Sequence, residues 1–151
     1  MFQEDNLADL HARNPLHGWV PRNGFWYSYN NGFRRTGWFH DHGTTWYFLH
    51  PSTGRMQTGW ITVDGHSYFL NPRGGAGHDS QRPEGAMLNS WVHFGQYWYF
   101  LNPQSGSNHN PAIPYGAMFR NVTRGINSVR RQFDSGGRWL VWYSDHTHVD
   151  F

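Results

Sequence analysis

The sequence contains no cysteine and no lysine. Without thiols the chain can form neither a disulfide framework nor a thiolate metal site. No run of about 18 apolar residues occurs, so no segment is predicted to span a membrane. Residues 1–15 carry acidic side chains early and lack an apolar stretch, and are therefore not expected to act as a signal peptide.

Carboxylates and clustered positive charge are also scarce. Glu4 and Glu84 are the only glutamates, which leaves little for a glycosidase-type carboxylate pair, and no catalytic residue is predicted. All twelve basic residues are arginines, and the net charge is only +2. The arginines are scattered rather than aligned in a stripe, so nucleic-acid binding is not expected.

Histidines are frequent, but they do not form a predicted metal site. His40-Asp41-His42 and the C-terminal His146, His148 and Asp150 have plausible donor spacings. Neither group supplies a third and fourth ligand, because the first lies at a hairpin turn and the second at the chain terminus. No metal and no cofactor are therefore predicted.

Aromatic residues and glycines are abundant. The chain has nine Trp, eight Tyr and eleven Phe, together 19% of its residues, and 18 Gly. Aliphatic residues are too few for a layered core. This composition favours a fold that buries flat rings between short strands joined by glycine turns, and it disfavours a helical bundle.

Four segments repeat one pattern, which begins with Gly-Trp or Ser-Trp. They start at Gly18, Gly37, Gly59 and Ser90, with spacings of 19, 22 and 31 residues. Repeats of this length indicate stacked supersecondary units. The last two units share an insertion that opens with Asn-Pro and closes with Gly-Ala-Met, which predicts equivalent surface loops after Asn71 and Asn102.

Each unit is predicted to form a β-hairpin. Asn23-Gly24 and Asp64-Gly65 are the dipeptides favoured in two-residue turns. Short aromatic and β-branched runs flank them, and alternate side chains in such runs point to opposite faces. A lone hairpin is marginal in water, so each unit must pack against its neighbours. The predicted fold is an all-β solenoid of stacked β-hairpin repeats.

Three parts follow along the chain. Residues 1–17 form an N-terminal segment, in which Asn6 to Arg13 are expected to form one or two helical turns. Residues 18–121 hold the four hairpin repeats. Residues 122–151 are expected to form a degenerate fifth unit that caps the stack, with Val122 in place of the opening Trp and a turn at Ser135-Gly136-Gly137. Trp139 and Trp142 are expected to pack there rather than bind a ligand.

The pattern GW-x(3–5)-G-x(1–2)-WYF-L-x-x-x-G-x-M-x-T-GW closely resembles the choline-binding repeat of bacterial cell-wall proteins. The second unit matches it best, through Gly37, Trp38, Trp46, Tyr47 and Met56. The resemblance implies a superhelix of hairpins with ligands bound where consecutive hairpins meet. Each aromatic cage would use the two tryptophans of one unit, a tyrosine of the next, and often a methionine.

Carried over to this sequence, the resemblance implies four cages. The two complete ones comprise Trp19, Trp26 and Tyr47 in the first, and Trp38, Trp46, Tyr68 and either Met56 or Met87 in the second. The third keeps Trp60 and Tyr99 but has Ser67 in the second tryptophan position. The fourth keeps Trp91 and Trp98, and Leu140 is the nearest match to its tyrosine.

The residue types suit a quaternary ammonium independently of the resemblance. Such a cation offers no hydrogen-bond donor and spreads its charge over methyl groups, and each ring face attracts it by roughly 0.5–2 kcal/mol. The predicted function is binding of choline on bacterial (lipo)teichoic acid as the extracellular, cell-wall-associated targeting module of a wall hydrolase or phage endolysin. Choline-dependent homodimers are a further expectation. The alternative is a carbohydrate-binding repeat of the glucan-binding or clostridial-toxin type, which keeps similar aromatic strands.

Overall fold

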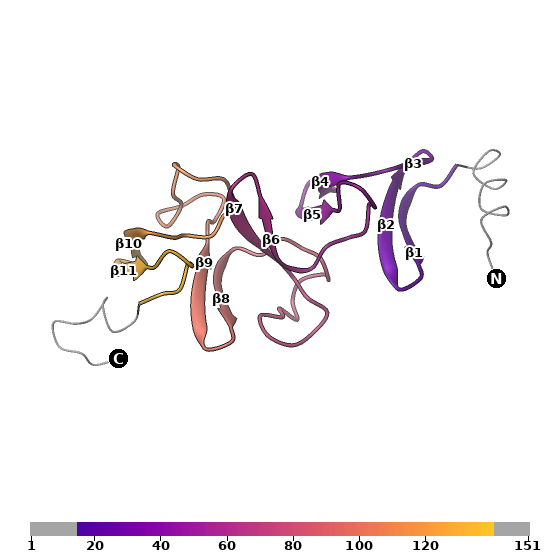
Figure 1. The fold of residues 1–151 in the computed structure, drawn as a ribbon. Helices are drawn as coiled ribbons and strands as arrows, with labels where there is room; N and C mark the ends of the chain where they lie inside the picture. The colour runs from indigo at the N-terminus through magenta and orange to yellow at the C-terminus, as the bar shows by residue number, and fades with distance from the viewer. Residues whose placement is uncertain (1–14, 141–151) are drawn as a thin grey trace. The chain divides into compact units, whose positions relative to one another are not determined.

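The computed structural model describes residues 15–140, and those residues form eleven β-strands and no helix. The expected helical turns at 6–13, Trp142 and the histidines at 146 and 148 lie outside the described residues. The strands, shown in Figure 1, are β1 (Gly18–Arg22), β2 (Phe25–Asn30), β3 (Phe33–Arg34), β4 (Gly37–Asp41), β5 (Thr45–Leu49), β6 (Gly59–Val63), β7 (His66–Leu70), β8 (Ser90–Phe94), β9 (Tyr97–Leu101), β10 (Val122–Ile126) and β11 (Val129–Phe133).

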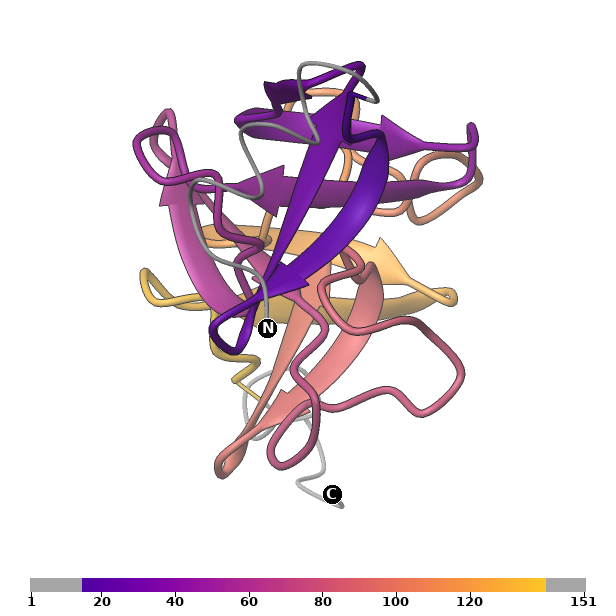
Figure 2. The same cartoon turned by 90° about the vertical axis from the view of Figure 1, so that its right-hand side faces the viewer.

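The chain divides into two compact units, Met1–Gln57 and Thr58–Phe151. The first unit contains the three-stranded sheet β1-β2-β3 and the β4-β5 hairpin. The second contains the hairpins β6-β7, β8-β9 and β10-β11. Figure 2 shows these hairpins as separate ribbons, and within the second unit β10-β11 runs across the direction of β8-β9. The predicted all-β fold of hairpin repeats is confirmed.

The hairpins share one register. The opening residues Gly37, Gly59 and Ser90 each pair with the last leucine of their hairpin. That leucine then forms an isolated antiparallel bridge to a methionine downstream, as in Leu101 with Met118. Because pairing and bridge recur together, each position can be assigned from hairpin to hairpin by register.

Turn chemistry explains why the strands reverse where they do. Asn23 and Gly24 have φ of 52° and 81°, and Asp64 and Gly65 have φ of 49° and 80°. Positive φ at both central residues defines the turn whose twist matches that of antiparallel strands. The two turns predicted from the sequence are therefore confirmed.

The last hairpin differs from its prediction. It contains a two-residue turn at Asn127 and Ser128, with φ of 54° and 66°, which was not predicted from the sequence. The predicted turn at Ser135-Gly136-Gly137 is also present: the Gly137 N–H donates to the Asp134 carbonyl at 3.0 Å, and the reversed chain forms the isolated antiparallel bridge between Phe133 and Trp139. Register also places Thr123 opposite Gln132, where Trp91 faces Phe100, so the counterpart of the opening tryptophan is Thr123 rather than Val122.

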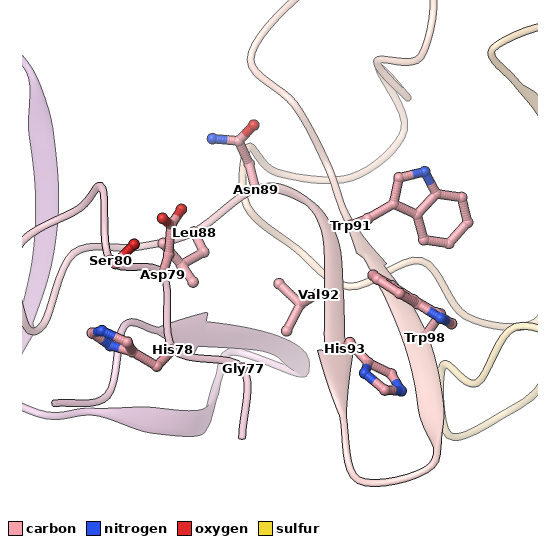
Figure 3. Close-up of a pocket in the computed structure, with 10 residues that line it drawn as sticks. All are labelled: Gly77, His78, Asp79, Ser80, Leu88, Asn89, Trp91, Val92, His93 and Trp98. Atoms are coloured by element: carbon pink, nitrogen blue, oxygen red, sulfur yellow. The ribbon is translucent and has the colours of Figure 1, made fainter. Parts of the chain in front are cut away.

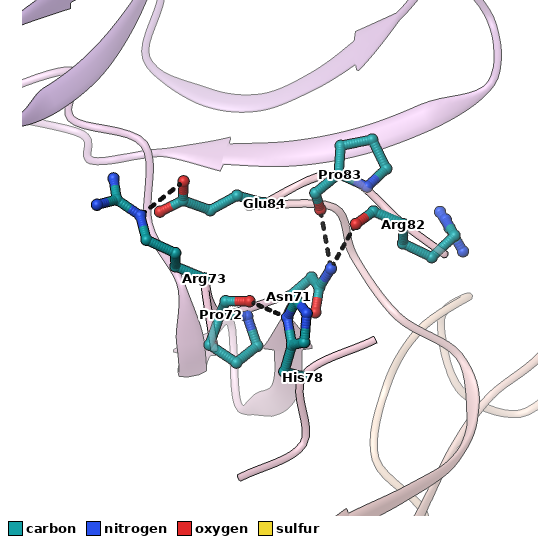
Figure 4. Close-up of polar contacts among 7 residues, drawn as sticks. All are labelled: Asn71, Pro72, Arg73, His78, Arg82, Pro83 and Glu84. Carbon is teal, nitrogen blue, oxygen red and sulfur yellow. Dashed lines mark hydrogen bonds and ion pairs between the residues drawn. The ribbon is translucent and has the colours of Figure 1, made fainter. Parts of the chain in front are cut away.

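A buried asparagine organises each of the two insertion loops. Asn71 is fully buried, and its Nδ2 donates to the carbonyls of Asp79, Arg82 and Pro83 at 2.9, 2.8 and 3.1 Å. Figure 4 shows two of these bonds beside the Arg73–Glu84 ion pair. Asn102 repeats the same pattern in the second loop. The equivalence predicted from the equal insertions is confirmed.

Small apolar clusters form where consecutive hairpins of the second unit meet. One cluster contains Phe69, Leu88, Val92, Leu101 and Met118, and the next contains Phe100, Phe119, Ile126 and Phe133. The rings are therefore buried between hairpins, as expected for units that cannot form a core alone.

Methionines and glycines interlock between hairpins. A Cβ added at Gly116 would collide with the Met87 sulfur, and one added at Gly137 would collide with the Met118 sulfur. Both glycines have positive φ, so any side chain there would be strained as well as obstructed.

Candidate aromatic ligand site

Two hairpins each present a pair of nearly perpendicular tryptophans. The ring centroids of Trp38 and Trp46 are 6.4 Å apart at 88°, and those of Trp91 and Trp98 are 6.3 Å apart at 89°. The pairing of His40 with Trp46 puts Trp38 and Trp46 on one face of β4-β5, because residues two apart share a face. Two perpendicular ring faces are an arrangement that can partly enclose a compact cation.

A second recurring contact joins one hairpin to the next. The rings of Trp19 and Tyr47 have centroids 4.9 Å apart at 66°, and those of Trp60 and Tyr99 are 4.9 Å apart at 64°. In each case the tryptophan opens one hairpin and the tyrosine lies on the second strand of the following hairpin. The predicted tryptophan–tyrosine partners of the first and third cages are therefore brought together.

The first cage lies within the first unit and gains two neighbours. The Met56 N–H donates to the carbonyl of Trp26 at 2.9 Å, which puts Met56 beside the first cage. Trp26 keeps 37% of its surface exposed. The Trp19 indole N–H donates to the Asp41 carboxylate at 3.0 Å, so a full negative charge lies one hydrogen bond from a cage ring.

The predicted members of the second cage are divided between the two units. Trp38 and Trp46 belong to the first unit and form the perpendicular pair described above. Tyr68 and Met87 belong to the second unit, where both are buried. Burial raises the pKa of the Tyr68 hydroxyl, and the nearby Asp64 carboxylate raises it further. This favours the neutral phenol at neutral pH.

The third cage has a serine where the others have a ring. Register pairs Ser67 with Thr62, and the Ser67 carbonyl accepts from the Met118 N–H at 2.8 Å, as Trp26 accepts from Met56. Phe94 packs against Trp60 with ring centroids 6.0 Å apart. An apolar side chain therefore fills part of the space between these two hairpins. Burial is the main cause of the raised pKa of Tyr99.

The fourth cage contains residues that the sequence pattern did not identify. Arg131 lies two residues before Phe133 on β11, as Tyr99 lies two before Leu101, so an arginine replaces the cage tyrosine. Trp139 bridges to Phe133 and donates its N–H to the Trp98 carbonyl at 2.9 Å, which gives it the position that methionine has elsewhere. Leu140, the nearest match by sequence, does not have the tyrosine position.

Trp91, Trp98, Arg131 and Trp139 line a cavity of about 280 Å³. The rings of Trp91 and Trp139 have centroids 5.3 Å apart. Burial lowers the pKa of the Arg131 guanidinium, although an arginine stays charged at neutral pH. This cavity therefore combines aromatic walls with a fixed positive charge.

Histidines stack on the outer tryptophan of two cages. The His40 ring lies 4.4 Å from Trp46 at 4°, and the His93 ring lies 4.6 Å from Trp98 at 21°. Figure 3 shows Trp98 between His93 and Trp91. Each pair faces across its hairpin, an arrangement that the spacing of histidines in the sequence did not reveal.

A more polar hollow lies on the histidine side of Trp98, as Figure 3 shows. Its volume is about 350 Å³, and it is lined by Gly77, His78, Asp79, Ser80, Leu88, Asn89, Trp91, Val92, His93 and Trp98. The insertion loop after Asn71 forms one wall and β8 the other. The corresponding later loop is pinned by the Asn108–Asn127 hydrogen bonds instead.

Among residues 15–140 no three His, Cys, Asp or Glu side chains gather as a metal site would require. His40, Asp41 and His42 are consecutive, and within that run Asp41 pairs with His42 at 2.9 Å. In the same part of the chain, no helix is long and apolar enough to cross a membrane.

Comparison with known proteins agrees with this geometry. Residues 36–56 and 58–76 match the family model of the choline-binding "cell wall binding repeat". No curated protein sequence matches the chain.

Solved structures from Streptococcus pneumoniae are similar over 83% of the chain. Choline binding protein F, solved in the presence of a peptidoglycan analogue, is 28% identical with a TM-score of 0.62. CbpJ is 29% identical with a TM-score of 0.63. The chain spans only 34% and 38% of those two proteins. The repeats, their register and these similarities agree: the chain contains choline-binding, cell-wall-binding repeats and is similar in fold to these choline-binding proteins.

Proposed function

We propose that this chain is a targeting module that binds the choline of (lipo)teichoic acid on a bacterial surface through aromatic cages between its hairpins. Its place of action is then outside the cell, on the wall. Its role is recognition, and any wall-cleaving chemistry belongs to another domain of a hydrolase or phage endolysin.

The recurring ring geometry carries this proposal. The perpendicular tryptophan pair appears twice with nearly the same distance and angle, and the tryptophan–tyrosine contact also appears twice. At Trp91 and Trp98 the perpendicular rings line a cavity, and Trp98 keeps 41% of its surface exposed, so ring faces there are open to a ligand. A repeated corner of ring faces suits a repeated cationic ligand, since each face attracts the cation by its quadrupole.

The first cage has a negative charge at one of its rings. It combines the Trp19–Tyr47 contact and the exposed Trp26 with the Asp41 carboxylate on the indole of Trp19. A carboxylate near the cage attracts a cation through space, while both of its oxygens are already engaged by Trp19 and His42 rather than open to a sugar hydroxyl. This supports choline over the glucan-type alternative. Choline-driven pairing of two chains belongs to the same proposal, and sedimentation with and without choline measures it.

Retention on a quaternary amine matrix tests the proposal. The chain carries a net charge of +2, so a positively charged matrix repels it unless specific cages bind the immobilised cation. We expect retention in moderate salt and release by free choline, with no release by the same concentration of sodium chloride. The double variant Trp19→Ala, Trp38→Ala should elute much earlier than Phe33→Ala, whose ring is 79% exposed and belongs to no cage.

Two results would contradict choline recognition. One is passage of the unmodified chain through the quaternary amine column. The other is retention on a dextran matrix that choline does not reverse, which would favour the carbohydrate-binding alternative.

A further inference from the structure

The fourth cage differs from the others because one of its walls is a positively charged guanidinium instead of a tyrosine ring. The Arg131 carbon Cζ lies 5.2 Å from the Trp91 ring centroid, close to the 4.9 Å that separates tyrosine and tryptophan in the first and third cages. The guanidinium thus stands where a tyrosine ring stands elsewhere. Among residues 15–140, no other arginine lies over a tryptophan of a candidate cage.

The guanidinium also covers part of the aromatic surface that a cation needs. It lies 4.7 Å from the Trp139 ring as well, so two of the three tryptophans already face a positive charge. A bare quaternary ammonium in the same cavity would be repelled at short range. Trp98 is the tryptophan that remains free of an arginine, and 41% of its surface is exposed.

Donors outnumber acceptors at this cavity. Arg131 uses its Nε to donate to the Ile126 carbonyl at 3.4 Å, and its two Nη groups donate to none of the residues from 15 to 140. The Trp139 indole N–H is buried without a hydrogen-bond partner. No carboxylate of the described residues pairs with Arg131, unlike Arg138, which pairs with Asp134.

A ligand with acceptor oxygens beside a quaternary ammonium matches these features. A planar guanidinium binds phosphate oxygens in a forked, charge-assisted geometry. The trimethylammonium end of the same ligand would face Trp98 and the open side of the cavity. The volume of about 280 Å³ is open enough to admit both ends of such a small zwitterion.

We propose that the fourth cage selects a phosphate ester of choline, a zwitterion, over free choline, and that Arg131 sets this preference. The inference rests on the proposed function for the ammonium end, but its phosphate contact is specific to this cage. It assigns Arg131 and Trp139 to the site and gives the cages of one chain different ligand preferences.

Titration of the full chain with choline and with phosphorylcholine tests the inference. The indole N–H signals of Trp91 and Trp139 in an NMR spectrum report the fourth cage, and that of Trp19 reports the first. We expect phosphorylcholine to bind the fourth cage at least about fivefold more tightly than choline, since a charge-assisted contact adds an attraction of this order. Arg131→Gln should remove the preference, and Arg131→Tyr should reverse it by restoring a ring wall.

Arg130→Gln provides the matched control, because Arg130 is an exposed neighbour whose replacement changes the net charge equally. It should leave the preference intact. Three outcomes would each overturn the inference. Choline could bind as tightly as phosphorylcholine, or more tightly, at Trp139; the Trp139 signal could fail to shift with either ligand; or the preference could persist in Arg131→Gln. Choline binding at Trp19 reports the proposed function separately, so failure of the inference and failure of choline recognition give different results.

Discussion

The environment of each cage tryptophan differs although the rings themselves recur. Trp19 donates to a carboxylate, Trp46 and Trp98 stack on histidines, and Trp91 lies beneath a guanidinium. These neighbours change the electrostatic potential at the ring face, which is what a quaternary ammonium senses. If the proposed cages bind choline, we therefore expect sites of different strength within one chain.

Asp41 should strengthen choline binding at the first cage. We expect Asp41→Asn to weaken it about two- to fivefold, because the amide oxygen can still accept from Trp19 but the negative charge is lost. The Trp19 indole signal during an NMR titration measures this. Asp64→Asn, the same change at an exposed turn residue of the second unit, serves as control. An unchanged first-cage affinity in Asp41→Asn would exclude the electrostatic role.

Ser67 should limit the third cage. Replacing it with Trp supplies the missing ring, and we expect choline affinity there to rise by about fivefold, or ~1 kcal/mol for one added cation–π contact. The Trp60 signal follows the change. Ser67→Leu adds apolar bulk without a π face, so a similar gain in that variant would show that filling, rather than the ring face, is responsible.

For single residues, the sequence predicted the recurring tryptophan–tyrosine contacts, but it did not predict the residues that replace the consensus in the fourth cage. The contacts of Trp19 with Tyr47 and of Trp60 with Tyr99 were implied by the resemblance to the choline-binding repeat, in which both positions recur. Arg131 and Trp139 could not be found this way. Each replaces a consensus residue by one of unlike chemistry, and only strand register reveals the equivalence.

The hairpin is the element that sequence reveals most directly, because its turn is local. Asn23-Gly24 and Asp64-Gly65 are residue pairs that readily adopt the positive φ that the turn requires, so the turn can be recognised from two adjacent residues. The turn at Gly136 and Gly137 was predicted and is present, whereas the Asn127-Ser128 turn contains no glycine and was not predicted. Pairing between hairpins depends on residues far apart in the sequence and is not encoded by any dipeptide.

The opening residue of each hairpin should control stability through its backbone. Ser90 has a φ of 67°, a region where a serine is strained, and it takes the place of a glycine. We expect Ser90→Gly to raise the free energy of unfolding by about 0.5–1 kcal/mol, the usual size of such relief. Urea denaturation measures the change.

Gly59 offers the reverse experiment. Its φ is 77°, and a Cβ added there would meet nothing within 4 Å, so backbone strain is the only expected cost. Gly59→Ser should lower the free energy of unfolding by about as much as Ser90→Gly raises it. If both variants shift stability in the same direction, backbone strain is not the cause.

If the cages bind choline as proposed, several weak sites on one chain gain strength by acting together. For one cage of about three ring contacts we expect a dissociation constant of about 1 mM. On a polymer with many cholines we expect apparent affinity to exceed that of free choline by roughly 10²–10⁴. Surface plasmon resonance on choline-bearing teichoic acid, compared with titration by free choline, measures the ratio.

Loss of a single cage should then affect the polymer disproportionately. Trp19→Ala should reduce affinity for the polymer at least roughly tenfold, while the remaining cages keep their affinity for free choline. Phe33→Ala should change neither value. Equal affinities of the unmodified chain for polymer and free ligand would show that the cages act one at a time.

The contact between a methionine and the next glycine has a consequence for how such a chain changes length. The Met87 side chain packs where Gly116 lacks a Cβ, and the Met118 side chain packs where Gly137 lacks one. In the second unit, a methionine of one repeat therefore depends on a glycine of the next. A deletion or duplication of whole repeats would preserve these methionine–glycine contacts, whereas a break between the methionine and its glycine would separate them. Added length is accommodated in the loops that precede these methionines, as the insertions after Asn71 and Asn102 show. In β10-β11 Trp139 takes the methionine position, so among the described residues the series of methionines stops there.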